Sequence, residues 1–256
     1  MLLCPVRDCH QALAREARRL FCPRAHSFDI ARSGYFNLLQ PQDSRSRNPG
    51  DTAAAVAARR RLHDLGITAP LLKAIRETGA VASGDTVLDA GCGDGFYLGS
   101  LASHSGCAAH GIDIAVPAID AAARRYPACE WVVANADRFI PYADNSFSLI
   151  LSITARRNTP EFRRVLADGG RLLIAIPAPD DLVELRGPGR DRVARTIEEF
   201  VPHFKLDSQQ RATPTADLDA SAVEDIQLAI YRPMQSQPAA AMQVTFSLDL
   251  LVLTPA

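Results

Sequence analysis

The chain has 256 residues, a hydrophobic content of 47% and a formal net charge of −1. This length suits one α/β domain with a small additional unit, and no apolar run reaches the roughly 18 residues that a membrane-spanning helix needs. The N-terminus lacks the charged and apolar regions of a secretory signal. These features predict a cytoplasmic protein with no membrane partner.

The net charge combines two opposite parts of the chain. Residues 1–61 contain eleven arginines, no lysine and five acidic residues, for a formal charge of +6, whereas the remainder carries −7. We call the arginine-rich residues 1–61 the basic front. A positively charged segment joined to an acidic remainder predicts an anionic partner that binds the basic front. The structural alternative is a few solvated arginines on an ordinary surface.

Four residues near the N-terminus have the spacing of metal ligands. Four residues separate Cys4 from Cys9, Cys22 follows after twelve more, and His26 after a further three. Three thiolates and one imidazole suit tetrahedral zinc in a small zinc ribbon. A unit of about 40 residues with few apolar side chains would also need a metal to fold. We therefore predict a structural zinc here; His10 is a competing ligand, and unmetallated cysteines are the structural alternative.

The segment after the predicted ribbon has the composition of a linker. Residues 41–51 are rich in Pro, Ser, Asn and Arg, and Thr52 is a predicted N-cap for an alanine-rich helix. A second helix is expected at about 69–78. The predicted domains are a zinc ribbon at 1–40, a basic linker at 41–51 and a larger α/β domain at 52–256.

Strands and helices alternate from residue 85 onward. The expected strands are 86–90, 108–112, 130–134, 147–153 and 171–176, and the expected helices lie near 96–104, 116–125 and 160–167. This alternation predicts an α/β fold with a Rossmann-like, doubly wound parallel sheet. Two later apolar runs, Ala222–Tyr231 and Met242–Leu253, have no clear helix between them, and 235–241 fits a hairpin connection. We expect them to end the sheet as an antiparallel pair.

The most specific local pattern is a strand that runs into a glycine turn. It reads Val87-Leu88-Asp89-Ala90-Gly91-Cys92-Gly93-Asp94-Gly95, followed by Phe96-Tyr97. Glycines let backbone approach a ligand closely. Their alternate spacing differs from the G-x-G-x-x-G of dinucleotide-binding folds. The pattern is instead typical of proteins that bind S-adenosylmethionine (SAM).

Two further segments should meet this turn, because the carboxyl ends of parallel strands share one edge of a sheet. Asp113 ends the second strand, where one carboxylate can accept hydrogen bonds from both ribose hydroxyls. Asn135-Ala136-Asp137 follows the third strand, where such a turn binds adenine. Asp89 can accept from the methionine amino group. Together these residues predict a SAM-dependent methyltransferase; a nicotinamide dinucleotide is the alternative that the glycine spacing disfavours.

Four strings before the glycine turn carry a more specific resemblance. They are Cys22-Pro23-x-x-His26-x-Phe28-Asp29, Gly34-Tyr35-x-Asn37-Leu38-Leu39, Ser44-Arg45-Ser46-Arg47-x-Pro49-Gly50-Asp51 and Ala58-Arg59-Arg60. On these strings the chain resembles the RlmA-type 23S rRNA (guanine-N1)-methyltransferases, from Cys4 to about Arg186. The resemblance implies a zinc ribbon joined to a Rossmann-like SAM domain and methylation of N1 of a guanine in a hairpin loop of large-subunit rRNA. It also implies a homodimer.

An RNA substrate would give the basic front its partner. Guanidinium groups contact phosphates bidentately and stack on bases. Tyr35 and Phe36 would either stack on a splayed base or pack in the ribbon core. The predicted RNA-binding residues are Arg45, Arg47, Arg59 and Arg60.

The chain departs from the family pattern at three places near the cofactor. Thr68 replaces a Tyr, Asp181 replaces a His, and Thr154-Ala155-Arg156 stands where the family reads roughly Tyr-Ala-Pro. The Met-Thr-Pro segment of the family's C-terminal part is not evident. The predicted cofactor-binding residues are Thr68, Asp89, Gly91, Cys92, Gly93, Gly95, Phe96, Tyr97, Asp113, Asn135, Ala136 and Asp181.

Methylation of guanine N1 requires the loss of a weakly acidic proton, so a base is expected near the methyl group. Asp137 and Asp181 are the candidate bases, and Arg156 or Arg157 is the candidate to stabilise negative charge on O6. The altered loop at 154–156 leaves two alternatives open. One is a SAM-dependent methyltransferase of another RNA or a small molecule, and the other is a SAM- or RNA-binding protein that has lost its activity.

Overall fold

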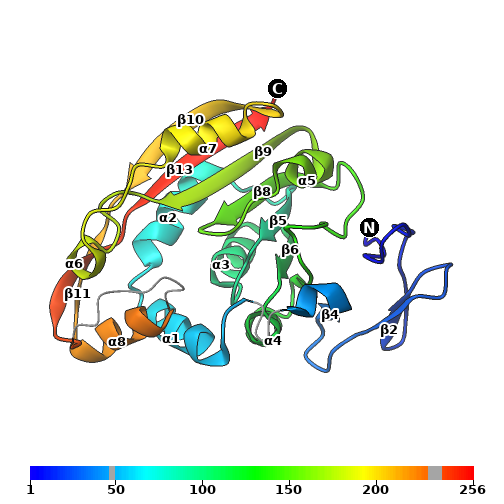
Figure 1. Ribbon diagram of the computed structural model, residues 1–256, viewed down its shortest axis with the longest axis horizontal. Helices are drawn as coiled ribbons and strands as arrows, with labels where there is room; N and C mark the ends of the chain where they lie inside the picture. The colour runs from blue at the N-terminus through cyan, green and yellow to red at the C-terminus, as the bar shows by residue number, and fades with distance from the viewer. Residues whose placement is uncertain (46–49, 230–237) are drawn as a thin grey trace.

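An eight-stranded mixed sheet organises the protein, whose computed structural model describes residues 1–45, 50–229 and 238–256 (Figure 1). The strands lie in the order β10-β13-β9-β8-β5-β6-β7-β4. Their bounds are β4 (Phe36–Asn37), β5 (Thr86–Ala90), β6 (Ala108–Asp113), β7 (Glu130–Val133), β8 (Phe147–Ile153), β9 (Leu166–Pro177), β10 (Phe204–Ala212) and β13 (Leu248–Pro255). Strands β7, β6, β5, β8 and β9 are parallel and follow the 3-2-1-4-5 order of a doubly wound fold.

Helices cover both faces of this sheet. One face packs against α1 (Ala53–Asp64), α2 (Ala69–Gly79), α3 (Phe96–Ser105), α4 (Val116–Arg125), α6 (Val183–Arg186) and α8 (Ala220–Ala229), and the other against α5 (Thr159–Val165) and α7 (Val193–Phe200). A separate two-stranded sheet joins β11 (Thr215–Leu218) to β12 (Met242–Thr245). Among the residues that the structure describes, no helix is both long enough and apolar enough to cross a membrane.

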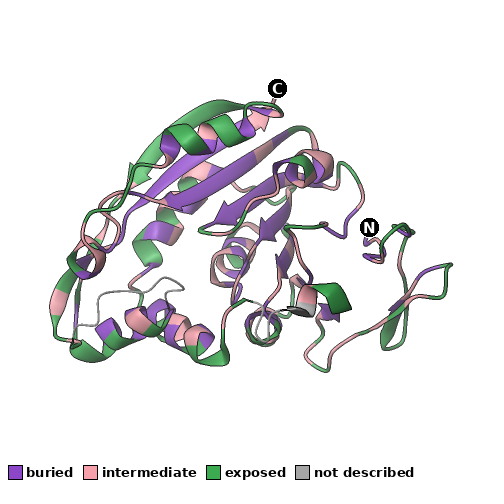
Figure 2. Cartoon of the chain, in the orientation of Figure 1, coloured by how far each residue is buried: buried purple, intermediate pink, exposed green. Residues whose placement is uncertain are grey.

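The central strands are apolar on both sides because both faces of the sheet are covered. In β8, Leu149 and Leu151 enter one core while Ile150 enters the other, and all three are fully buried (Figure 2). In β5, Val87 and Leu88 divide between the two cores in the same way. Such continuous apolar runs are characteristic of parallel sheets, and they explain why these strands could be predicted.

The N-terminal unit shares a core with the large sheet. Its own sheet comprises β1 (Ala14–Glu16), β2 (Arg19–Phe21) and β3 (Ser27–Asp29), and it projects beyond the β4 edge (Figure 1). Strand β4, however, pairs in parallel with β7, through Phe36 with Val132 and Asn37 with Val133. Phe36 is buried in the second core, so of its two predicted environments it adopts the packed one.

The predicted antiparallel ending is confirmed, but one of its strands was wrongly placed. Strand β13 is antiparallel to both β9 and β10, so its outer partner is β10 and not the apolar run at 222–231. Its described part, residues 222–229, belongs to α8, because Ala222, Ile226 and Ala229 recur at helical spacing and the Asp219 carboxylate accepts from the Ala222 amide at 2.8 Å. Residues 235–237 of the predicted 235–241 connection lie outside the described residues.

Strand β10 gave no sequence signal. Seven of its nine residues are exposed, and the exposed run includes Lys205, Asp207 and Gln209. A polar edge strand has neither the alternation nor the apolar run by which strands are recognised, and its charges protect the open edge from pairing with other chains.

Gly111 tests the packing of strand β6 against the Trp131 ring of the neighbouring strand β7. A Cβ added at Gly111 would clash with the Trp131 ring, which is itself buried under the glycine turn. We expect Gly111→Ala to lower the free energy of unfolding by about 2 kcal/mol or more, the usual cost of overpacking. Urea denaturation measures the change. Gly84→Ala is the matched control because a Cβ there meets open space; equal midpoints for the two variants would contradict the packing.

Candidate active site and metal centre

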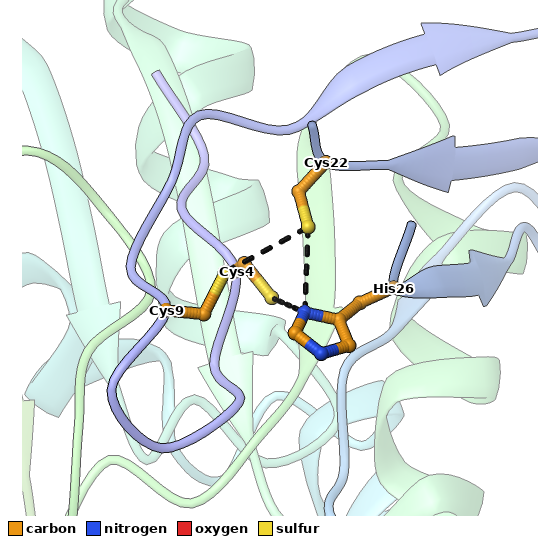
Figure 3. Close-up of side chains that lie close together, drawn as sticks. All are labelled: Cys4, Cys9, Cys22 and His26. Atoms are coloured by element: carbon orange, nitrogen blue, oxygen red, sulfur yellow. Dashed lines mark hydrogen bonds between the residues drawn. The ribbon is translucent and has the colours of Figure 1, made fainter. Parts of the chain in front are cut away.

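The four predicted metal ligands converge in the N-terminal unit (Figure 3). Nδ1 of His26 lies 3.4 Å from Sγ of Cys4 and 3.4 Å from Sγ of Cys22, and the sulfurs of Cys9 and Cys22 are 3.7 Å apart. A zinc ion with Zn–S bonds of ~2.3 Å and Zn–N bonds of ~2.0 Å would place its tetrahedral ligands roughly 3.5–3.8 Å from one another. The observed separations therefore fit a tetrahedral zinc site.

Turns on either side of β2 position these ligands. The Cys9 amide donates to the Val6 carbonyl, and the Ala25 amide donates to the Cys22 carbonyl, so each pair of ligands lies on a tight turn. Burial raises the pKa of the Cys4 thiol to about 12, and a metal cation would supply the charge that allows it to ionise. His10, the competing ligand, instead stacks on Phe139 with ring centroids 4.2 Å apart.

The glycine turn after β5 holds backbone that only glycine adopts readily. Gly91, Gly93 and Gly95 have φ values of 87°, 55° and 76°. A Cβ on Gly91 would collide with Ala155, and one on Gly95 would collide with Trp131. The glycines therefore admit both the turn and its close neighbours, and they place the loop after β8 directly against the predicted cofactor site.

Asp113 joins the end of β6 to this turn. Its Oδ2 accepts from the Gly93 amide at 2.9 Å and its Oδ1 accepts from the Ala115 amide at 2.8 Å. Burial raises its pKa, although both amides act against that shift. Each carboxylate oxygen can accept a second hydrogen bond, so Asp113 keeps capacity for the predicted ribose hydroxyls.

Asp89 is a buried acid with an unpaired oxygen. It is 1% exposed, and its Oδ1 has no hydrogen-bond partner among the residues that the structure describes. Burial, aided by the nearby Asp113 charge, raises its pKa to about 8. An unpaired buried acceptor is costly, and a cationic donor on a ligand would satisfy it.

A stacked histidine connects helix α1 to the turn. The His63 ring lies parallel to Phe96 with centroids 3.9 Å apart, and its Nδ1 is 2.6 Å from the Thr68 hydroxyl. Its Nε2 is 3.7 Å from Oδ1 of Asp94. Burial, with a contribution from Arg59, lowers the pKa of His63 to about 3, so the ring is neutral. The structure thus places the predicted Thr68 and Phe96 together, and it adds a histidine that the sequence analysis missed.

Three predicted residues meet where strands β7 and β8 end. Asn135 lies after β7, and its amide donates to Oδ1 of Asp43 at 3.2 Å, while its own oxygen accepts from the Asp137 amide. The Asp137 carboxylate faces Nη1 of Arg156 at 3.3 Å, with Arg156 84% exposed. The Asn158 amide donates to the Asp137 carbonyl at 2.8 Å and so ties the two loops together.

The loop after β8 begins with strained backbone. Thr154 has a φ of 51°, which is unusual for a β-branched residue and costs of order 1–3 kcal/mol. Its amide donates to the Ala175 carbonyl at 2.8 Å, and this bond helps to hold the strained turn. Ala155 is thereby placed against Gly91.

Asp181 lies apart from the Asp137–Arg156 pair, in the loop after β9. Its Oδ1 accepts from the Ser247 amide at 3.0 Å, and its Oδ2 is 3.8 Å from Arg186. Burial raises its pKa. The two candidate bases therefore occupy different environments, one exposed and ion-paired and the other half-buried.

Two of the four predicted RNA-binding arginines, Arg59 and Arg60, have side chains that the structure describes. Both are half-buried on α1, and Arg59 lies at the glycine turn and forms an ion pair with Asp51. Arg47 lies outside the described residues, and for Arg45 the structure describes only the backbone, at the end of the short helix η1 (Pro41–Arg45). The sequence did contain a signal for the inward position of Arg59, because Val56, Arg59 and His63 recur at the spacing of residues that share one face of a helix.

The metal centre gives a direct prediction. We expect about one zinc per purified chain, and Cys22→Ser should abolish zinc retention in the presence of a mild chelator, because an incomplete tetrahedral site binds zinc far more weakly. Elemental mass spectrometry measures the stoichiometry. Cys129→Ser, at a half-buried cysteine distant in sequence from the cluster, should keep its zinc. Full zinc retention by Cys22→Ser would overturn the ligand assignment.

Two protein families match the chain. The family described as "RlmA, N-terminal", a zinc ribbon, matches residues 2–47, and the family described as "Methyltransferase domain" matches residues 87–173. The first match contains all four metal ligands, and the second runs from β5 and its glycine turn into β9. SAM and zinc are therefore the cofactors of this fold and metal centre.

Solved structures share the fold at low sequence identity. A TehB-like SAM-dependent methyltransferase from Corynebacterium glutamicum superposes with a TM-score of 0.52 and 21% identity, covering 80% of this chain and 99% of that one. The cyclase SpnF superposes with a TM-score of 0.52 and 15% identity, covering 72% of this chain and 80% of that one. Since a cyclase shares it, the fold alone does not define the reaction.

Curated relatives match most of the chain. The 23S rRNA (guanine(748)-N(1))-methyltransferase of Streptomyces fradiae is 36% identical over 233 residues, covering 87% of this chain and 81% of that one. A Micromonospora griseorubida protein, provisionally named a 23S rRNA (guanine-N(1)-)-methyltransferase, is 36% identical over 231 residues, covering 80% and 77%. Each match covers more than three quarters of both chains. The chain belongs to the RlmA-type family of 23S rRNA (guanine-N1)-methyltransferases.

Proposed function

We propose that this protein transfers a methyl group from SAM to N1 of a guanine in a hairpin loop of 23S rRNA. The observation that carries the proposal is the combination, in this one chain, of a zinc ribbon and a SAM-type glycine turn; the Streptomyces relative, named a 23S rRNA (guanine(748)-N(1))-methyltransferase, is 36% identical over most of the chain. Ribosomal RNA places the activity in the cytoplasm. Family resemblance further supports action as a homodimer.

The residues at the carboxyl ends of the strands fit SAM. When bound, SAM supplies an activated methyl group on a sulfonium, so the protein's task is to position the acceptor and manage a proton. The unpaired oxygen of Asp89 would accept from the ammonium of the methionine portion, and Asp113 would accept from the ribose. Asn135 and Ala136 would flank the adenine.

The acceptor side is formed by the loops after β7, β8 and β9. Asp181 is the better candidate base, because burial raises its pKa toward the neutral range in which a base both holds and releases a proton. Asp137 is paired with Arg156 and would orient it. Both candidate arginines are ion-paired, but Arg157 is half-buried against Glu199 at 2.9 Å whereas Arg156 is exposed, so Arg156 is the better placed to stabilise negative charge on O6.

The basic front is the proposed RNA surface. The N-terminal unit exposes six arginines, namely Arg7, Arg15, Arg18, Arg19, Arg24 and Arg32. Arg60 continues this positive charge on α1, and Arg45 and Arg47 add two further arginines to the sequence between the ribbon and α1. Arginine-rich surfaces of this kind bind phosphate backbone and single-stranded bases.

The substrate is tested by methylation of rRNA that lacks the modification. Purified protein with radiolabelled SAM should label 23S rRNA, and reverse transcription should stop at one guanine, because methylation at N1 blocks base pairing. Asp181→Asn should lower the rate by about 100-fold, the usual contribution of a positioned base. Absence of label in rRNA would overturn the proposal. Label in other RNA or in metabolite extracts would then identify another methyltransferase, and SAM binding without turnover would identify an inactive protein.

Asp89 connects cofactor affinity to pH-dependent stability. Loss of a hydrogen bond between charged groups should lower the SAM affinity of Asp89→Asn by about tenfold to a hundredfold, measured by calorimetry. The unliganded variant should also gain stability. Asp89 keeps its proton in the folded protein up to about pH 8, but in the unfolded chain it loses it near pH 4. Its contribution to stability therefore falls as pH rises between these values.

The gain of Asp89→Asn over the wild type should accordingly be larger at pH 8 than at pH 5 in urea denaturation. Asp207→Asn, which removes an exposed acid on β10, is the matched control for the loss of one negative charge. A pH-independent difference between Asp89→Asn and the wild type would show that the buried carboxyl does not titrate as inferred.

A further inference from the structure

One cation reaches into the acid-lined glycine turn. Arg59 extends from α1, and its Nη1 lies 3.4 Å from the position that a Cβ on Gly93 would occupy. The guanidinium is therefore in van der Waals range of the turn that the SAM-binding proposal uses. Its side chain is 27% exposed, which is low for an arginine on a helix of the molecular surface.

Two hydrogen bonds fix the Arg59 side chain in this place. Nη1 donates to Oδ2 of Asp51 at 2.6 Å, and Nη2 donates to the carbonyl oxygen of Ala229 at 2.9 Å. These partners come from the end of the linker and from the last residue of α8. A side chain held from two sides is preorganised, so little rotamer entropy is left to lose when a ligand binds.

The charges around the turn leave Arg59 in a distinct role. The pKa of Arg59 is raised: burial acts against its charge, but the carboxylates of Asp51, Asp94 and Asp113 outweigh burial. The neighbouring His63 is neutral. Arg125, whose charge also reaches Asp94, is paired with Asp64 at 2.7 Å. Arg60, on the same helix, also acts on Asp94, but Arg59 is the arginine whose guanidinium lies against Gly93.

We infer that Arg59 binds the carboxylate of the methionine portion of SAM. A guanidinium has five N–H donors, and the bonds between Arg59 and other described residues use two of them. The remaining donors can form the paired contact that suits a carboxylate. The turn then offers complementary groups to both charges of an amino acid, with Asp89 for the ammonium and Arg59 for the carboxylate. This inference rests on SAM as the cofactor of the proposed function.

The inference is tested by comparing SAM with decarboxylated SAM, which lacks the carboxylate and retains the ammonium. Calorimetry on the full-length protein should show that the wild type prefers SAM by tenfold or more. Arg59→Gln should lose this preference, because its SAM affinity falls by tenfold or more while its affinity for decarboxylated SAM stays within about twofold. Retained binding of decarboxylated SAM also shows that the variant pocket is folded.

Two control variants separate carboxylate recognition from general effects. Asp89→Asn should weaken both ligands alike, because both carry the ammonium. Arg124→Gln removes one positive charge from an exposed, ion-paired arginine on α4 and should change neither affinity. If Arg59→Gln does not fold, Arg59→Lys keeps the charge without the planar fork and should retain only part of the preference.

Two results would overturn the inference. An equal loss for both ligands in Arg59→Gln would show that Arg59 only shapes the pocket, and an unchanged preference for SAM would show that the carboxylate binds elsewhere. Both measurements need no RNA. A protein that shows the predicted ligand preference and does not label rRNA would therefore disprove the substrate proposal and leave the role of Arg59 standing.

Discussion

The pairing of β4 with β7 is the constraint on which the arrangement of the site depends. Because Phe36–Asn37 runs parallel to β7, the chain leaves β4 at the carboxyl-end edge of the sheet, where the cofactor-binding loops lie. Asp43 then accepts a hydrogen bond from Asn135. A Cβ built on Gly50 would lie 3.0 Å from the Ile114 side chain and 2.7 Å from that of Ala115, so Gly50 packs tightly against the residues that follow β6. The described residues near the two ends of the linker, Asp43 and Gly50, are thereby placed at the cofactor edge.

Buried acids at this edge are maintained at a cost to the unliganded protein. Asp89, Asp94 and Asp113 all have pKa values raised chiefly by burial, which means that each charge is poorly solvated in the fold. A stable apolar core would not include them. SAM carries a sulfonium and an ammonium, so it would compensate the acids on binding. These buried acids therefore lower the stability of the free protein and raise its affinity for a cationic ligand.

The sequence predicted the elements whose signals are local. Parallel strands buried on both faces, the glycine turn and the metal ligands all depend on residue type and short spacing, and each was found where expected. The failures have a common cause. Strand β10 is polar because it is an edge strand, and the inward position of Arg59 depends on Asp51 and on the end of α8, which lies 170 residues away in sequence. Neither the role of a polar strand nor the direction of an arginine on a helix is contained in its local sequence.

One departure from the family pattern, Thr154-Ala155-Arg156, lies in the loop after β8, whereas Thr68 and Asp181 stand at positions that were predicted to bind the cofactor. In the loop after β8, the strained backbone of Thr154, the packing of Ala155 on Gly91 and the exposed Arg156 occur together. Strain of this kind persists only where surrounding contacts enforce it. Asn158 and the Thr154 amide supply those contacts. Under the proposed function, the altered residues of this loop bear on which guanine is accepted and, through Arg156, on the negative charge that develops at O6.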